Sequence, residues 1–175
     1  MMNRPSAPVE LEQAAAICPN LGIGVHLVLT AGNPLLPPEK ITTLVREDGS
    51  FLRQDDLVRK ITQVNLEQVS AEWHAQVEKY LKVTGHAPDH LDSHHHSSYF
   101  TPGLFERMLR LAEEIDCPIR KPFGVNSADA ADYLPVELAK NSIAAFESLP
   151  GYAHLRTTDK FFGEFYDETA TLEHL

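Results

Sequence analysis

The sequence predicts an α/β fold built on a mainly parallel sheet. Three strand-like stretches alternate with helix-like segments: residues 21–30, the stretch that ends near Asp92, and residues 117–120. The first stretch is a nearly continuous apolar run, which is typical of a strand buried on both faces. Because parallel strands are joined by crossover helices, we expect the strand ends near Thr30, Asp92 and Arg120 to lie on one rim of the sheet.

The composition favours one ordinary globular domain over residues 1–175, with 43% hydrophobic and 23% charged residues. The net charge of −10 and the scattered Lys and Arg residues predict no nucleic-acid and no membrane partner. No apolar stretch reaches the roughly 18 residues that a membrane span needs, so we expect a cytoplasmic location. Cys18 and Cys117 lie far apart in the sequence, and we expect both to be reduced and buried.

The first half of the chain predicts helices, a loop and a hairpin around the first strand. We expect a helix over residues 8–17 and a Gly- and Pro-rich loop over residues 31–38. Asp48-Gly49 predicts a type I′ turn in a β-hairpin over residues 44–52. A helix is then expected from Asp55 to Val64.

A second, longer helix should run from about Asn65 to Gly85, because apolar residues fall there at helical spacing. Trp73 and Tyr80 should face the core from this helix. Thr101 is the expected N-cap of the next helix, over residues 104–115. Further on, helix-like stretches cover residues 128–131 and 136–149, and another begins near Asp167.

The strongest functional signal is the run His90-Leu91-Asp92-Ser93-His94-His95-His96, at the end of the second predicted strand. A cloning tag would lie at a terminus, whereas this run is internal and contains a carboxylate. Strand alternation would place His90, Asp92, His94 and His96 on one face and His95, as a structural residue, on the other. Imidazoles and carboxylates are ligands of divalent metals in catalytic sites, and metal-activated water indicates hydrolysis.

Several motifs together resemble those of the YdjC-like carbohydrate deacetylases, the chitooligosaccharide deacetylase family. They are Gly22-Ile23-Gly24-Val25-His26-Leu27-Val28-Leu29-Thr30 with Gly32-Asn33-Pro34-Leu35 after it, Arg46-Glu47-Asp48-Gly49, Gly85-His86-Ala87-Pro88, the histidine run, and Pro118-Ile119-Arg120. The resemblance covers essentially the whole chain and is strongest over residues 1–125. It implies a (β/α)-barrel-like fold and metal-dependent removal of acetyl groups from N-acetylated sugars or chitooligosaccharides.

The resemblance also implies roles for individual residues. His26 and His94 would be metal ligands, with Mg²⁺ as the metal; two nitrogen ligands favour Zn²⁺ on physical grounds. The remaining site candidates would contact the substrate or orient the ligands: His90, Asp92, His96 and Arg120. Asp92 in particular would accept a hydrogen bond from the free ring N–H of a ligand histidine. A homodimer is compatible with the sequence.

The sequence departs from the family pattern at both ends. Family members begin with a strand that ends in Asp-Asp-Phe-Gly, whose aspartates supply a metal ligand and the catalytic base. Residues 1–5 resemble the segment after the first helix of the family, and Asp55-Asp56 opens a helix instead. A late Cys-His-Pro segment has no counterpart either. We therefore expect a partial domain, with two alternatives to deacetylation: hydrolysis of another amide or ester, or a non-catalytic metal- or sugar-binding remnant.

Overall fold

The computed structural model describes residues 1–120, 147–154, 156–158 and 171. At its centre two parallel strands pair in register: β1 (Val25–Leu27) lies beside β2 (Leu91–Ser93). A parallel bridge from Leu91 to Ile119 adds the third predicted stretch to the other edge of β2. The predicted α/β class and the parallel pairing are therefore confirmed.

Strand β1 is shorter than the predicted stretch over residues 21–30. Beyond its end, the side chain of Gln76 accepts a hydrogen bond from the Val28 N–H at 2.9 Å and donates one to the Val28 carbonyl at 2.9 Å. These two bonds replace the ones that a neighbouring strand would make. The apolar run is buried from Val25 to Leu29 except for half-buried His26. Only three of its residues, Val25–Leu27, pair with a neighbouring strand.

Four α-helices are described: α1 (Ala7–Ile17), α2 (Gln54–Arg59), α3 (Leu66–Thr84) and α4 (Pro102–Glu114). Short 3₁₀ segments lie between and after them: η1 (Pro38–Lys40), η2 (Ile61–Gln63), η3 (His94–Tyr99) and η5 (Tyr152–His154). The helix expected from Asp55 to Val64 is interrupted at Lys60, where α2 gives way to η2. The first helix agrees closely with the expected range.

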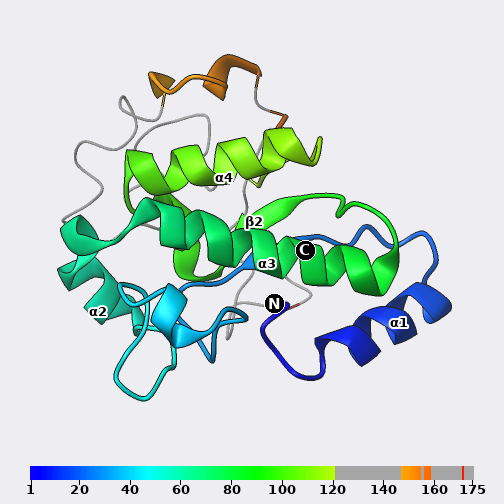
Figure 1. Cartoon of the computed structure of the whole chain (residues 1–175). Helices are drawn as coiled ribbons and strands as arrows, with labels where there is room; N and C mark the ends of the chain where they lie inside the picture. The colour runs from blue at the N-terminus through cyan, green and yellow to red at the C-terminus, as the bar shows by residue number, and fades with distance from the viewer. Residues whose placement is uncertain (121–146, 155, 159–170, 172–175) are drawn as a thin grey trace.

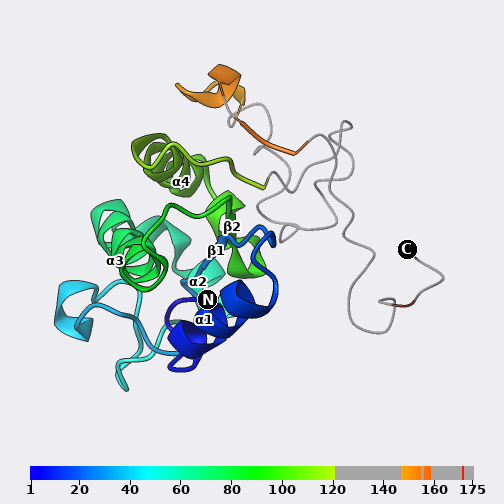
Figure 2. The same cartoon turned by 90° about the vertical axis from the view of Figure 1, so that its right-hand side faces the viewer.

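The two long helices follow their sequence signals. The Asn65 side chain accepts hydrogen bonds from the N–H groups of Glu67 and Gln68 at the start of α3, and Gly85 ends the helix with a left-handed φ of 75°. Thr101 caps α4 by accepting from the Leu104 N–H. Helices α3 and α4 pack side by side next to the strands, while α1 lies on the β1 side (Figures 1 and 2).

The core lies between these helices and the strands, and Trp73 and Tyr80 are completely buried in it, as predicted. Burying such aromatic side chains removes a large apolar area from water and is worth about 1.5–3 kcal/mol for each. The other large buried side chains come from β1, α2, η3, α4 and the loops: Leu27, Leu29, Ile41, Leu44, Leu52, Leu57, Tyr99, Phe100 and Phe105.

Two local predictions are wrong. The segment over residues 44–52 makes one antiparallel bridge, and only Gly49 of the Asp48-Gly49 pair has a positive φ, of 80°. The Gly49 N–H donates to the Arg46 carbonyl, so the turn is not type I′, which needs two positive φ angles. Cys18 is exposed because α1 ends at the surface, whereas Cys117 is buried as expected.

Several expectations fall on residues that the structure does not describe. The helix-like stretches over 128–131 and most of 136–149, and the helix start near Asp167, lie outside the described residues. Within the described part of the chain, no helix combines the length and the apolar character that crossing a membrane requires.

Candidate functional site

Residues from the ends of β1 and β2 meet in one polar cluster. The His26 Nδ1–H donates to Asp92 Oδ1 at 2.6 Å, across the register pair that joins the two strands. On the other side of the same ring, His26 Nε2 lies 3.3 Å from His94 Nδ1. In its neutral form His26 therefore keeps an Nε2 lone pair directed at His94. The structure thus brings together the two histidines that the sequence analysis selected.

The Asp92 carboxylate is held between two cationic or proton-donating groups. Its second oxygen, Oδ2, lies 3.0 Å from Arg120 Nη1. Burial acts to raise the pKa of Asp92, but the hydrogen bond and charge of His26 and the charge of Arg120 outweigh it, so the pKa lies below its ordinary value. Asp92 is therefore ionised at neutral pH and remains an acceptor for the His26 ring N–H.

Burial has the opposite consequence for the neighbouring imidazoles. Desolvation, together with the charges of His95 and His26, lowers the pKa of His94 to about 4. Desolvation and the charge of Arg120 likewise lower the pKa of His96 to about 4. Both rings are neutral at pH 7, which is the protonation state that a metal ligand needs.

The remaining predicted residues lie at different distances from this cluster. The ring of half-buried His96 faces Tyr99, with 6.5 Å between the ring centroids. His90 precedes β2 and packs against Gly24, where an added Cβ would lie 2.4 Å from His90 Nε2. Among the described residues, His90 makes no hydrogen bond to the cluster, so its predicted place beside Asp92 at the site is not supported by a contact.

Strand alternation does not continue through the histidine run. β2 ends at Ser93, and His95 and His96 adopt left-handed φ angles of 52° and 53°. This turn brings His95 back toward His94, with 3.9 Å between their ring centroids, and lets Thr30 Oγ1 lie 3.0 Å from His95 Nδ1. The prediction that His95 points to the other face, away from His94, is therefore wrong. No sequence signal marked Thr30 as part of the site.

The donor set fits part of a metal centre. Two nitrogens bound tetrahedrally to one zinc ion at about 2.0–2.1 Å lie about 3.3 Å apart. The observed separation of His26 Nε2 and His94 Nδ1 is 3.3 Å. Within the described ranges, however, no group of three or more His, Cys, Asp or Glu residues is placed to hold a metal ion. The two ring nitrogens therefore have the separation of two ligands of one ion, and the described residues add no third ligand.

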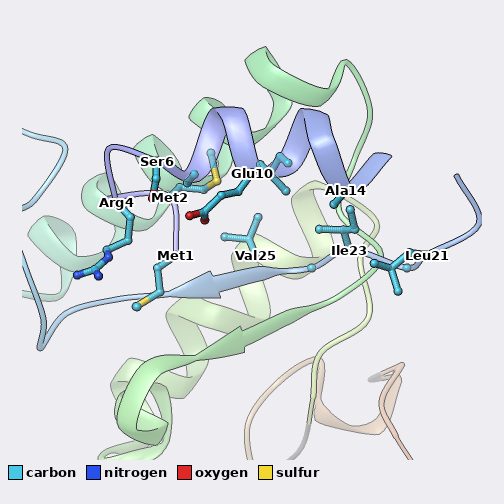
Figure 3. Close-up of a pocket in the computed structure, with 13 residues that line it drawn as sticks. Met1, Met2, Arg4, Ser6, Glu10, Ala14, Leu21, Ile23 and Val25 are labelled. Atoms are coloured by element: carbon cyan, nitrogen blue, oxygen red, sulfur yellow. The ribbon is translucent and has the colours of Figure 1, made fainter. Parts of the chain in front are cut away.

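A cavity of about 500 Å³ lies on the opposite edge of β1, between this strand and α1 (Figure 3). Five consecutive residues, Leu21–Val25, line one wall, and Met1, Arg4 and Glu10 line the other. None of the clustered histidines lines this cavity. Within the described residues, the sheet has two strands and β1 is paired only on the β2 side. The cavity thus lies along the segment that leads into β1 and reaches the strand at Val25.

The family comparison covers the whole chain. The family model described as "YdjC-like protein" matches residues 1–175. A "Carbohydrate deacetylase" of Enterococcus faecalis is 35% identical over 174 residues, covering 97% of this chain and 58% of that protein. A "Chitooligosaccharide deacetylase" of Proteus mirabilis is 36% identical over 115 residues, covering 63% of this chain and 43% of that protein.

A solved structure supports the same relationship at the level of the fold. The crystal structure of an Enterococcus faecalis protein, described as a candidate cellobiose-phosphate cleavage protein, superposes with a TM-score of 0.72 at 34% identity. The match covers 95% of this chain and 57% of that one. The matched part of this chain therefore spans between 43% and 58% of the length of these relatives.

Proposed function

Because the chain belongs to the YdjC-like protein family, we propose that it forms part of a metal-dependent deacetylase for N-acetylated sugars or chitooligosaccharides. The observation that carries the proposal is the convergence of His26 and His94, whose ring nitrogens lie 3.3 Å apart. The family relationship also supports a (β/α)-barrel-like fold, in which β1, β2 and the Ile119 segment would be successive parallel strands. The cytoplasmic location and a homodimer stay predictions.

In the proposed reaction, water adds its oxygen to the acetyl carbonyl carbon, the C–N bond breaks, acetate leaves and the sugar nitrogen takes up a proton. A divalent ion held by His26 and His94 would supply Lewis acidity and lower the pKa of water near the acetyl group. Zn²⁺ suits the two nitrogen donors, and Mg²⁺ is the metal that the family resemblance implies.

The other residues of the cluster would act through these two histidines. Asp92, held by Arg120, accepts from His26 Nδ1–H and so fixes the tautomer in which Nε2 is free to bind a metal. His96 and Arg120, both near the ends of their strands, are proposed to contact the sugar. His90 would act only through its charge on Asp92, since it packs against Gly24.

The reaction also needs a carboxylate base to take the proton of the water. Asp92 is the carboxylate that contacts the described cluster, and both of its oxygens are engaged. We propose that an acidic strand, such as the Asp-Asp strand of the family pattern, supplies the base and a third ligand by pairing with the open edge of β1. The cavity along Leu21–Val25 gives such a strand room.

The test is acetate release from diacetylchitobiose by this chain and by a longer form that carries an Asp-Asp strand before residue 1. We expect no detectable release from residues 1–175 alone and metal-dependent release from the longer form, abolished by a chelator. In the longer form, His26→Ala and His94→Ala should each abolish release. His86→Ala is the matched control, because His86 is exposed and lies at the opposite end of β2.

The same assay separates the alternatives. A longer form that is inactive on chitooligosaccharides but hydrolyses another amide or ester through the same histidines would indicate a different substrate. A form that binds metal and hydrolyses nothing would indicate the non-catalytic alternative. Deacetylation that survives both His26→Ala and His94→Ala would rule out the proposed site.

A further inference from the structure

The His94 ring has an unusual means of support. Metal-binding imidazoles are commonly fixed by a hydrogen bond from the second ring nitrogen to a carboxylate or a carbonyl group. Among the described residues, the hydrogen-bond contact of His94 is the one from Nδ1 to His26, which is the contact that a metal would replace. Something other than a hydrogen bond on Nε2 must therefore hold this ring in place.

The ring of His95 provides that support. Its centroid lies 3.9 Å from the centroid of His94, and the two planes are tilted by 32°, so the rings are stacked. His26 meets His94 edge-on instead, at 5.4 Å and 78°. His94 is thus held between a stacked ring on one face and an edge contact at its ligand nitrogen.

Thr30 in turn fixes His95. Thr30 follows β1, is only 6% exposed, and its hydroxyl lies 3.0 Å from His95 Nδ1. A left-handed φ such as the 52° of His95 is strained for a residue with a side chain. The bond to Thr30 and the stack on His94 offset part of that strain, because both depend on the left-handed turn.

We propose that Thr30 and His95 form a positioning pair that orients the His94 imidazole toward His26. The proposal rests on the proposed function in one respect, since the ligand that His94 would hold is the divalent metal. Neither residue is assigned a contact with substrate or with the reacting atoms. Thr30 acts through His95, and His95 acts through the stack on His94.

The first measurement needs no metal. Ring ¹⁵N–¹H correlation spectra of the metal-free protein report the tautomer and the mobility of each histidine. Thr30→Val keeps the shape of the side chain but removes the hydroxyl, so the His94 ring signals should shift and broaden. Thr30→Ser keeps the hydroxyl and should restore them. Thr42→Val is the matched control, because Thr42 is exposed in a loop away from the strands.

A second variant covers the case in which Thr30→Val does not fold. His95 is exposed, so His95→Ala should fold, and it removes the stacked ring directly. It should change the His94 signals in the same way as Thr30→Val. Signals of His94 that stay at their wild-type positions in both variants would overturn the positioning pair, whatever the metal affinity.

The effect of ring positioning on metal binding is then measured as the Co²⁺ affinity, by competition with a chelating dye. Loss of an outer contact to a metal ligand typically weakens binding about 10–100-fold, and we expect Thr30→Val to fall in that range while Thr30→Ser stays near wild type. If wild type binds no Co²⁺, the metal site of the proposed function fails, and the ring signals alone decide the positioning pair. Wild-type Co²⁺ affinity in both Thr30→Val and His95→Ala would contradict the proposal.

Discussion

The two ends of the β1–β2 pair are built from different chemistry. At the amino end, the Ile23 N–H donates to Asp89 at 2.7 Å, Tyr80 donates to the Ile23 carbonyl at 3.1 Å, and Cys117 donates to the Pro88 carbonyl at 3.2 Å. Each of these hydrogen bonds joins a side chain to a backbone group. They tie α3 and the loops to the segments that lead into the strands.

The carboxyl end gathers imidazoles instead, on a strained turn. His94 contacts both His26 and His95, and the pKa of His94 is lowered to about 4 by burial and by the neighbouring rings. In such a cluster the protonated form of each ring is disfavoured, because burial removes water and a second positive charge would be repelled. We propose from this contrast that the amino end serves stability and the carboxyl end serves function, the division that α/β folds commonly make.

The largest effect should come from the amino end. Tyr80→Ala removes a completely buried ring and should lower the free energy of unfolding by about 3–5 kcal/mol, measured by urea denaturation. Tyr80→Phe removes only the bond to the Ile23 carbonyl and should cost about 1 kcal/mol. If either folded variant changed Co²⁺ affinity as strongly as it changed stability, the division between the two ends would be wrong.

At the carboxyl end, a substitution should change the metal affinity more than it changes the free energy of unfolding. Asp92→Asn removes the charged acceptor of His26 Nδ1–H and lets the amide favour the tautomer that protonates Nε2. Co²⁺ affinity should fall about 10–100-fold, while the loss of unfolding free energy should be smaller than for Tyr80→Ala. Titration calorimetry and urea denaturation on the same sample measure both. Unchanged affinity in Asp92→Asn would remove Asp92 from the site.

Glu72 should show the smallest effect, as a dependence of stability on pH. Its buried carboxylate accepts from the N–H groups of Leu35 and Leu36 and from Gln76, and burial raises its pKa above the ordinary 4.5. The folded state therefore holds the Glu72 proton to higher pH than the unfolded state does. Its contribution to stability is present below pH 4.5 and is lost as pH rises through the raised pKa.

Glu72→Gln keeps an acceptor oxygen for the loop and cannot titrate. The difference in unfolding free energy between the variant and wild type should shift in favour of the variant as pH rises from 4 to 8. A difference that is independent of pH would show that Glu72 keeps its ordinary pKa in the fold. Because Glu72 anchors the loop that leaves the carboxyl end of β1, the result also shows how much that end depends on a buried charge.

The helices could be predicted from local signals, because each signal acts within a few residues. Asn65 and Gly85 bound α3, and Thr101 begins α4, where the sequence analysis placed them. The strand over residues 21–30 was predicted too long, because hydrophobicity reports burial and not the hydrogen-bond partner; Gln76 takes the place of a strand at Val28.

The pairing of His26 with His94 followed from motif resemblance and from the rule on strand ends, and the structure brings the two rings together. The role of His95 could not be predicted. A left-handed φ is rare for histidine and depends on tertiary contacts. The alternation of side chains along a strand therefore predicted the wrong face for the His95 ring. The bond to Thr30 joins residues 65 positions apart and leaves no local trace in the sequence.

The proposed function depends above all on His26 and His94 holding one divalent ion together. The most direct measurement is a Co²⁺ titration of this chain followed by histidine ring ¹⁵N–¹H spectra. We predict weak binding that perturbs Nε2 of His26 and moves the remaining ring proton of His94 to Nε2. His26→Ala and His94→Ala should each abolish these changes, and His86→Ala should not. Co²⁺ binding that leaves both rings unperturbed, or that survives either alanine variant, would contradict a shared metal site.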